Sequence, residues 1–357
     1  MTAPDALLAF AALCVEGVSR RRVRHALGAF WTGTPPQAAD REVWAAIETA
    51  KSTNTFHRDL DLLAARDIQV LPRNDPAFPA QVRAIPDPPV ALLVQGSVAA
   101  LASQCIAIVG SRRATPNGRR IAEALATDLA LQGVVVVSGL ARGIDAAAHR
   151  GSLAANRPTI AVLGAGHARL YPAQHASLVR DMIDHGGSIV SEYPPHWPVR
   201  KEQFPERNRL VSGFAAGVII VEASERSGSL ITARLALEQG REVMAVPGPV
   251  GAPTSRGCHR LIKQGAALIE GPDDVWDALG VPAPGPTTRS DATPPLPTDA
   301  GAYVLAEVQF EPTPTDDIVQ ATGLPPSEVL RHLARLEIAG FVEPASGGYI
   351  RRPSQRV

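Results

Sequence analysis

The sequence predicts an α/β protein with a doubly wound parallel sheet at its centre. A small helical region precedes this core, and a helix–turn–helix with a hairpin follows it. The main observation is that short β-branched apolar runs alternate with helical patterns between residues 105 and 280. Proline-rich segments flank this stretch on both sides. Because 357 residues exceed one compact core, two or three domains are expected.

Six short apolar runs predict the strands of the central domain, residues 105–280. They are mostly β-branched, as is typical of strands that are buried on both faces. The runs span 106–109, 134–137, 159–163, 188–190, 218–221 and 243–246. Helical patterns lie between them at 118–132, 144–155, 173–185, 207–214 and 231–239. Ligands of such sheets bind beyond the carboxyl ends of the strands, so the loops there, which we call the rim, hold the candidate site.

The amino-terminal region, residues 1–68, is predicted to form four small helices. Ser19 is expected to cap the second, which begins with an arginine-rich turn. A helix, a glycine-containing turn and a second helix resemble a SAM-like or helix-hairpin-helix module, which can contact DNA backbones. A small packing domain with a solvated basic face is preferred, because the turn lacks a Gly-x-Gly pair. Residues 69–104 are proline-rich and predict an extended connector with an edge or entry strand at 90–94.

The carboxyl-terminal part is predicted to be a linker followed by a winged helix. Residues 281–298 are rich in Pro, Thr, Gly and Ala without an apolar face, which is typical of a linker. Residues 299–357 contain helical patterns and then a hairpin pattern, which together indicate a winged helix. Arg331 and Arg335 could enter a DNA groove, or the domain could bind a protein. The sequence leaves both open.

The composition sets limits on partners and location. The formal net charge is zero, so contact with nucleic acid must come from local patches. Only three of the 35 basic residues are lysines, and the arginines can bind phosphate in a bidentate manner. The three cysteines are scattered, as in a protein of a reducing cytosol. With neither a signal pattern nor a membrane-length apolar run, we expect a cytoplasmic protein without a membrane partner.

The turn after the first strand of the central domain is the strongest single candidate for phosphate binding. Gly110 lets the backbone approach a ligand, while Ser111 adds a hydroxyl group and Arg112 adds a planar cation. A helix start follows, with its unpaired N–H groups and partial positive charge. Taken alone, this segment could equally be an ordinary strand-to-helix turn with a surface arginine.

Several other loops of the rim carry glycine, serine and basic residues. Their convergence on one edge favours a basic groove over simple surface solvation. Phe204 lies among these cations, so an aromatic ring could stack a base while the cations follow a phosphate backbone. The alternative is a core phenylalanine at a helix entry. The basic residues of the rim are Arg112, Arg113, Arg142, Lys201, Arg207 and Arg209.

A catalytic interpretation finds less support. Asp145 and His149 share one helix face, and Ser138 or Ser111 could lie nearby, but no Gly-x-Ser-x-Gly segment is present. Asp145 is better explained as a helix-start residue and His149 as a packed histidine. Phosphate-loop and dinucleotide motifs are also missing. We therefore expect a binding protein without catalytic residues, metal or cofactor.

Several motifs, in one order and spacing, resemble the DprA/Smf family (DNA processing protein A). The resemblance is strong over about residues 105–270 and extends to both flanking domains. It rests on Val-Gly-Ser-Arg at 109–112, Ser-Gly-Leu-Ala-Arg-Gly-Ile-Asp at 138–145, Phe-Pro-Glu-Arg-Asn-Arg at 204–209, Ser-Gly-Ser-Leu-Ile-Thr-Ala at 227–233 and Val-Pro-Gly at 246–248.

The resemblance implies a Rossmann-like core and a non-enzymatic protein that binds single-stranded DNA. Such a protein protects incoming DNA in natural transformation, loads the recombinase RecA and forms a homodimer through the core. The implied phosphate-binding turn is 110–112, and Lys201 and Phe204 match the family's backbone-binding and base-stacking pair. Arg142 stands where relatives often have lysine, and Asn208 and Arg209 fall in an Arg-Asn-Arg segment.

One segment departs from the family, and two other functions compete. Residues 171–175 read Tyr-Pro-Ala-Gln-His, where relatives often carry Lys and Asn, which places a contact at this loop in doubt. The first competitor is a Rossmann-type nucleoside monophosphate phosphoribohydrolase, whose Pro-Gly-Gly-x-Gly-Thr is replaced here by Glu222-Ala223-Ser224. The second is a winged-helix ligand-sensing repressor, which would prefer a specific duplex over single strands.

Overall fold

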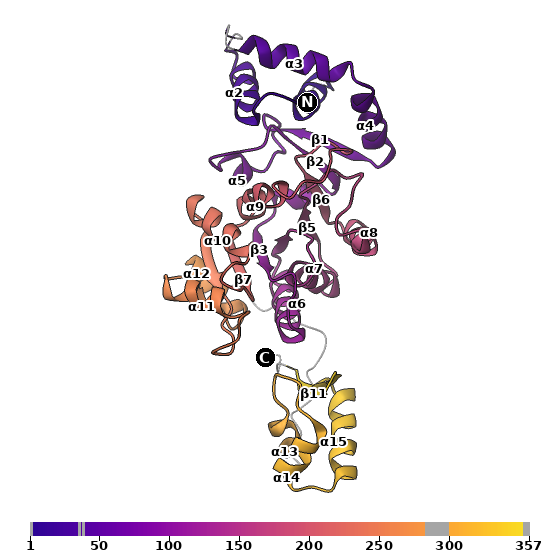
Figure 1. Ribbon diagram of the computed structural model, residues 1–357, viewed down its shortest axis with the longest axis vertical. Helices are drawn as coiled ribbons and strands as arrows, with labels where there is room; N and C mark the ends of the chain where they lie inside the picture. Colours follow the sequence, from indigo (N-terminus) through magenta and orange to yellow (C-terminus); the bar gives the residue numbers. More distant parts are fainter. Residues whose placement is uncertain (1–2, 35–36, 38–39, 283–299, 353–357) are drawn as a thin grey trace. The chain divides into compact units, whose positions relative to one another are not determined.

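A nine-stranded sheet forms the centre of the larger of two units in the chain (Figure 1). The computed structural model describes residues 3–34, 37, 40–282 and 300–352, and the two units comprise residues 1–286 and 287–357. The strand order is β1-β2-β6-β5-β4-β3-β7-β8-β9. The strands are β1 Ile68–Pro72, β2 Ala91–Gly96, β3 Cys105–Gly110, β4 Val135–Ser138, β5 Thr159–Val162, β6 Ser188–Ser191, β7 Gly217–Val221, β8 Glu242–Ala245 and β9 Ala267–Leu268.

Helices cover both faces of this sheet, which confirms the doubly wound α/β prediction. Side chains of β3 alternate, so Ile106 and Ile108 enter one core cluster while Ala107 and Val109 enter the other. The face that carries Ile106 and Ile108 is covered by α6 Pro116–Leu131, α7 Ile144–Ala154 and α12 Pro272–Leu279, with α8 Ala176–Asp184 beside α7. The opposite face, which carries Ala107 and Val109, is covered by α5 Ala80–Arg83, α9 Gln203–Phe214, α10 Ser229–Glu238 and α11 Arg256–Lys263.

The chain changes direction across the sheet at β3. From β3 it adds β4, β5 and β6 on one side, and it then returns to place β7, β8 and β9 on the other. Seven strands, β3 to β9, run parallel, and Gly110 at the end of β3 pairs with Val221 at the end of β7. In open α/β sheets such a reversal leaves a crevice beyond the strand ends, where ligands bind.

Four helices form the amino-terminal region and pack on β1 and β2. They are α1 Ala3–Leu13, α2 Arg20–Trp31, α3 Arg41–Lys51 and α4 Asn54–Ala65, and Ser19 caps α2 as predicted. Their core cluster includes Ile68 and Leu93 of the two strands. Residues 69–104, predicted as a connector with an edge or entry strand, contain β2 and most of β1. Their strands extend the central sheet, with β2 antiparallel to β6 and β1 antiparallel to β2.

The second unit is the predicted winged helix. It contains α13 Ala300–Glu307, α14 Thr315–Thr322, α15 Pro326–Ile338 and the hairpin of β10 Val342–Ala345 with β11 Gly348–Arg351. Apolar side chains from all three helices and from the hairpin form one core, which includes Leu305, Ile318, Leu333 and Val342. The predicted linker at 281–298 lies almost entirely outside the described residues.

Candidate nucleic-acid interface

The turn from Gly110 to Arg112 is held between two neighbouring strand ends. The Ser111 N–H donates to the carbonyl of Glu222, which follows β7, at 2.8 Å. Ser111 accepts a bond from the Ile144 N–H through its own carbonyl at 3.2 Å. A Cβ on Gly110 would lie 1.8 Å from the carbonyl oxygen of Val221, so only glycine allows the two strands to end this close together. The Arg112 side chain is exposed.

The loop after β4 contacts this turn and presents Arg142 beside it. Gly143 has a φ of 80°, and a Cβ there would lie 2.2 Å from the carbonyl oxygen of Ser111. The position therefore needs glycine both for its backbone conformation and for the close approach. Arg142, directly before it, is exposed. Two arginines predicted as phosphate ligands thus lie on adjoining loops of the rim.

Phe204 brings an aromatic ring to the same loops. It lies in the first turn of α9, whose start is stabilised when the Gln203 side chain accepts a bond from the Arg200 N–H at 2.7 Å. The guanidinium of Arg112 lies 5.4 Å from the centroid of the Phe204 ring. This distance is that of a cation–π contact. The structure therefore joins the predicted phosphate-binding turn to the predicted base-stacking residue.

Two further contacts position the Phe204 ring. A Cβ on Gly164, in the loop after β5, would lie 2.8 Å from the ring, so this glycine leaves room for it. The Tyr171 ring lies 5.5 Å away in an edge-to-face arrangement and is 52% exposed. The departure of residues 171–175 from the family pattern places a contact at this loop in doubt. In the structure, Tyr171 lies next to the site. In the sequence, only the position of Tyr171 after a predicted strand indicated that it could lie there.

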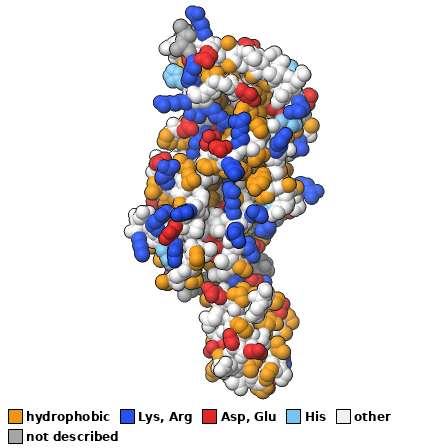
Figure 2. Space-filling model, in the orientation of Figure 1, with side chains coloured by type: hydrophobic (Ala, Val, Ile, Leu, Met, Phe, Trp, Pro, Cys, Tyr) orange, Lys and Arg blue, Asp and Glu red, His pale blue; other side chains and the backbone are white. Residues whose placement is uncertain are grey.

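The exposed cations of this group lack carboxylate partners. Arg112, Arg142 and Lys201 are exposed, and none of them forms an ion pair within the described residues. Basic side chains are spread over the viewed face of the larger unit, and hardly any lie on the viewed face of the smaller one (Figure 2). Unpaired cations on loops around an aromatic ring are the arrangement that single strands require.

Arg207 lies inside the protein. Its side chain is only 3% exposed, and it donates to the carbonyl oxygens of Gly139, at 2.8 Å, and Val162. Burial lowers the pKa of Arg207 to about 10, although the Asp145 carboxylate acts in the opposite direction. The guanidinium thus ties together the ends of β4 and β5. Direct contact of Arg207 with DNA stays a prediction, and its burial does not support it.

Arg209 and Asn208 also have partners within the protein. Arg209 donates to Asp87 at 3.0 Å and to Glu192 at 2.6 Å, and it is 8% exposed. Asp87 also binds Arg24 of α2, so this cluster joins the amino-terminal helices to the sheet. Asn208 is half-buried and makes a long bond to the carbonyl of Gly228. A direct DNA role for Arg209 is as weakly supported as one for Arg207.

The side chains considered for hydrolysis serve the backbone. The Asp145 carboxylate accepts bonds from the N–H groups of Gly139 and Ala141 at 3.1 and 3.2 Å, as expected of a helix-start residue. His149 is fully buried against Thr159, and burial lowers its pKa to about 3. Ser138 donates to a strand carbonyl and is also buried. None of these three is free to act on a ligand at the rim.

Glu222 fills the place where a phosphate would meet a helix start. Its carboxylate accepts bonds from the N–H of Thr115, at 2.9 Å, and from the Thr115 hydroxyl group, and it lies against Gly118. Because α6 begins there, its partial positive charge is already balanced by this side chain. A nucleotide phosphate could bind at this helix start only by displacing Glu222. The sequence analysis did not predict this contact.

The described residues offer neither a metal cluster nor a membrane-spanning helix. Among them, no group of three or more His, Cys, Asp or Glu side chains could hold a metal ion. In the same part of the chain, no helix is both long and apolar enough to cross a membrane.

Several solved structures and curated sequences that are similar to this chain are DprA or Smf proteins. DNA processing protein A from Streptococcus pneumoniae superposes with a TM-score of 0.64 at 31% identity, covering 74% of this chain and 95% of that one. DNA processing protein A from Helicobacter pylori, whose structure was described for its single-stranded DNA binding mode, superposes with a TM-score of 0.52 at 31% identity. This match covers 56% of this chain and 92% of that one. Protein Smf from Escherichia coli is 43% identical over 292 residues, which is 79% of this chain and 77% of that protein.

Two family profiles match consecutive parts of the chain. The profile described as DNA recombination-mediator protein A matches residues 69–280, and the DprA winged helix domain matches residues 287–348. The first includes β1 and β2, in agreement with the sheet. The order of the strands, the match over more than half of the chain and the identity to Protein Smf lead to one conclusion. This chain belongs to the DprA/Smf family of DNA recombination-mediator proteins.

Proposed function

We propose that this protein binds single-stranded DNA at the rim, without cleaving it. The arrangement of Arg112 over Phe204 carries the proposal, because it joins a cation and an aromatic ring on loops that meet at the strand ends. Arg142 and Lys201 supply further phosphate contacts, and Tyr171 offers a second ring, which is exposed, beside the half-buried Phe204. Stacking and charge together bind unpaired strands with little sequence preference.

In this proposal Arg207 and Arg209 position the interface and do not touch DNA. Arg207 holds the loops after β4 and β5, which carry Arg142 and Gly164. Arg209 holds α9 against Asp87 and Glu192, and Phe204 lies at the start of the same helix. Buried cations with such partners set the distance between the loops that contact the ligand.

The cellular role we propose is that of a cytoplasmic recombination mediator. It protects incoming single strands during natural transformation and loads RecA onto them, and it acts as a homodimer. Two similarities support this role: the family is one of recombination mediators, and the related Helicobacter pylori protein binds single-stranded DNA. The RecA step is tested by RecA ATPase activity on single strands already coated with single-strand binding protein. If this protein gave no acceleration there, RecA loading would be rejected while DNA binding could stand.

The alternatives have less support from the geometry. In a phosphoribohydrolase, a carboxylate must reach the nucleotide, but the Glu222 carboxylate is occupied by Thr115. In a repressor, the second helix of the helix–turn–helix must meet DNA, but this helix, α15, exposes Leu330 and Ile338 at 50% and 89%. Apolar side chains at these positions suit a protein partner better than a groove of the duplex.

The decisive experiment compares the ligands of the alternatives in one assay. Fluorescence anisotropy with labelled oligothymidylate and with a labelled duplex of equal length measures the preference for single strands. In parallel, nucleoside monophosphates are incubated with the protein, and free base is measured by chromatography. We expect tighter binding of the single strand and no base release. Preferred binding of the duplex, or turnover of a nucleotide, would contradict the proposal.

A further inference from the structure

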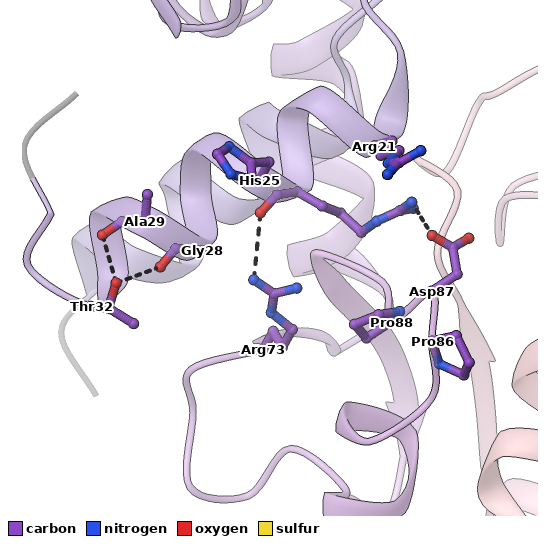
Figure 3. A pocket seen from close by; sticks show the side chains of 10 residues that line it. Arg21, His25, Gly28, Ala29, Thr32, Arg73, Pro86, Asp87 and Pro88 are labelled. Carbon is purple, nitrogen blue, oxygen red and sulfur yellow. Dashed lines mark hydrogen bonds and ion pairs between the residues drawn. The ribbon is translucent and has the colours of Figure 1, made fainter. Parts of the chain in front are cut away.

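A second basic recess lies on the amino-terminal side of the larger unit, between α2 and the proline segment before β2 (Figure 3). We call it the α2 groove. It is open to solvent, has a volume of about 690 Å³ and contains none of the rim residues discussed above. The residues that line it are Arg21, Arg24, His25, Gly28, Ala29, Thr32, Arg73, Pro86, Asp87 and Pro88.

The charges that line the α2 groove are unbalanced. Arg21, Arg24 and Arg73 face a single acidic side chain, Asp87. The Asp87 carboxylate is already shared, because Arg24 binds one oxygen and Arg209 donates to the other at 3.0 Å. Arg73 also lines the groove (Figure 3), and it forms no ion pair with Asp87 among the described residues. The groove therefore carries a net positive charge before any ligand binds.

Arg73 is the side chain that most needs an anion. It is half-buried, and its one hydrogen bond among the described residues is a long contact of 3.5 Å to the carbonyl of Arg24. Burial lowers the pKa of Arg73, and the cations Arg24 and Arg83 lower it further. A guanidinium has five N–H donors, so most of its capacity is unused within the protein. A bound anion would offset both the burial and the repulsion.

The backbone of α2 leaves space for Arg73 in this position. A Cβ on Gly28 would lie 2.6 Å from Arg73 Nη2, so a larger residue in the middle of α2 would displace the guanidinium. Glycine inside a helix costs stability, on the order of 1 kcal/mol relative to alanine. Here it lets the cation lie against the helix. The guanidinium also lies 6.0 Å from the ring centroid of Trp31, which makes this tryptophan a reporter of the groove.

We propose that the α2 groove binds a phosphate group of a nucleotide-sized ligand, at a site separate from the rim. Planar guanidinium groups match the oxygen geometry of phosphate, and the volume falls within the range of small-ligand sites. The phosphate belongs either to a free nucleotide or to the backbone of DNA that continues past the rim. The chemistry of recognition is the same in both cases, and the experiment separates the two sources.

The test uses the full chain and isothermal titration with inorganic phosphate, with dAMP and with a short oligothymidylate. Intrinsic tryptophan fluorescence, to which Trp31 contributes, is followed in parallel. We expect saturable binding that becomes at least fivefold weaker in Arg73→Gln and in Arg21→Ala. The matched control is Arg22→Ala, which removes the same charge from the next residue. Arg22 donates to Glu42 of α3 at 2.7 Å and does not line the groove, so binding should be unchanged.

Two further variants make the test independent of the rim and of folding. Phe204→Ala weakens the proposed rim site and should leave phosphate and dAMP binding intact, so a failure of one proposal does not imply failure of the other. Gly28→Ala should weaken binding by displacing Arg73, even if Arg73→Gln folds poorly. A loss of affinity in Arg73→Gln that is confined to dAMP would assign the site to free nucleotides, and a loss confined to the oligonucleotide would assign it to DNA. Absence of saturable binding, or equal loss in Arg22→Ala, would overturn the proposal.

Discussion

The salt dependence of DNA binding tests the proposed interface most directly, because its slope reports how many cations meet phosphate groups. Arg112, Arg142 and Lys201 are exposed and have no carboxylate partner among the described residues. Each phosphate contact to a single strand contributes a slope of about −0.7 to the logarithm of affinity against the logarithm of salt. Three contacts per chain therefore predict a slope of about −2, and removal of one predicts about −1.4.

Charge and stacking should separate in this measurement. Between about 50 and 200 mM salt, three contacts predict an affinity loss of about 18-fold, and two contacts predict about 7-fold. Lys201→Ala should therefore reduce the slope. Phe204→Ala should remove a stacking free energy of about 1–3 kcal/mol, which is about 5- to 150-fold in affinity, and leave the slope unchanged.

Fluorescence anisotropy with labelled oligothymidylate over a series of salt concentrations provides the measurement. Arg234→Ala is the control, because this exposed arginine pairs with Glu238 on α10 and is not one of the rim residues. Its slope and affinity should equal those of the unmodified protein. A slope near zero in the unmodified protein, or equal slopes in Lys201→Ala and the unmodified protein, would refute the assignment of these cations to the phosphate backbone.

Three further predictions concern buried groups. Arg207→Ala should lower the free energy of unfolding by about 3 kcal/mol or more, because two strand-end carbonyls lose their donor. Urea denaturation measures this change, and an unchanged midpoint would contradict the prediction. Glu222→Ala should lower the free energy of unfolding by about 1–2 kcal/mol, because its bonds to Thr115 are lost. DNA affinity should stay within twofold of that of the unmodified protein. A large loss of affinity would instead place Glu222 in the interface. Burial lowers the pKa of His149 to about 3 and that of His167 to about 4, so the unfolded chain takes up protons below about pH 6.5 while the folded chain does not. The free energy of unfolding should therefore be fully retained above about pH 6.5. As the pH decreases toward 4, it should fall by about 1.4 kcal/mol per pH unit for each histidine. Denaturation measured at pH 7, 6 and 5 that showed no such fall would count against this prediction.

Local patterns predicted most elements and the order of the domains. Apolar runs with β-branched residues marked β3 to β8 to within about one residue, since such runs are buried on both faces of a parallel sheet. Ser19 marked the start of α2 because its side chain caps the helix. The pairing of β2 with β6 was not predicted. It joins segments about a hundred residues apart, and no local period records which distant strand is the neighbour.

The sequence by itself determined which chemical groups follow the strands: glycine turns, an aromatic residue and several arginines. Only the tertiary structure decided which of those arginines face solvent. Arg112 and Arg207 look alike in the sequence, but one lies over the Phe204 ring and the other is buried against carbonyls from two strand ends. The α2 groove arises in the same way, since Arg24 and Arg73 meet only after β1 and β2 have joined the sheet. Burial and charge pairing depend on partners that are distant in the chain, and for that reason they emerge only in the folded protein.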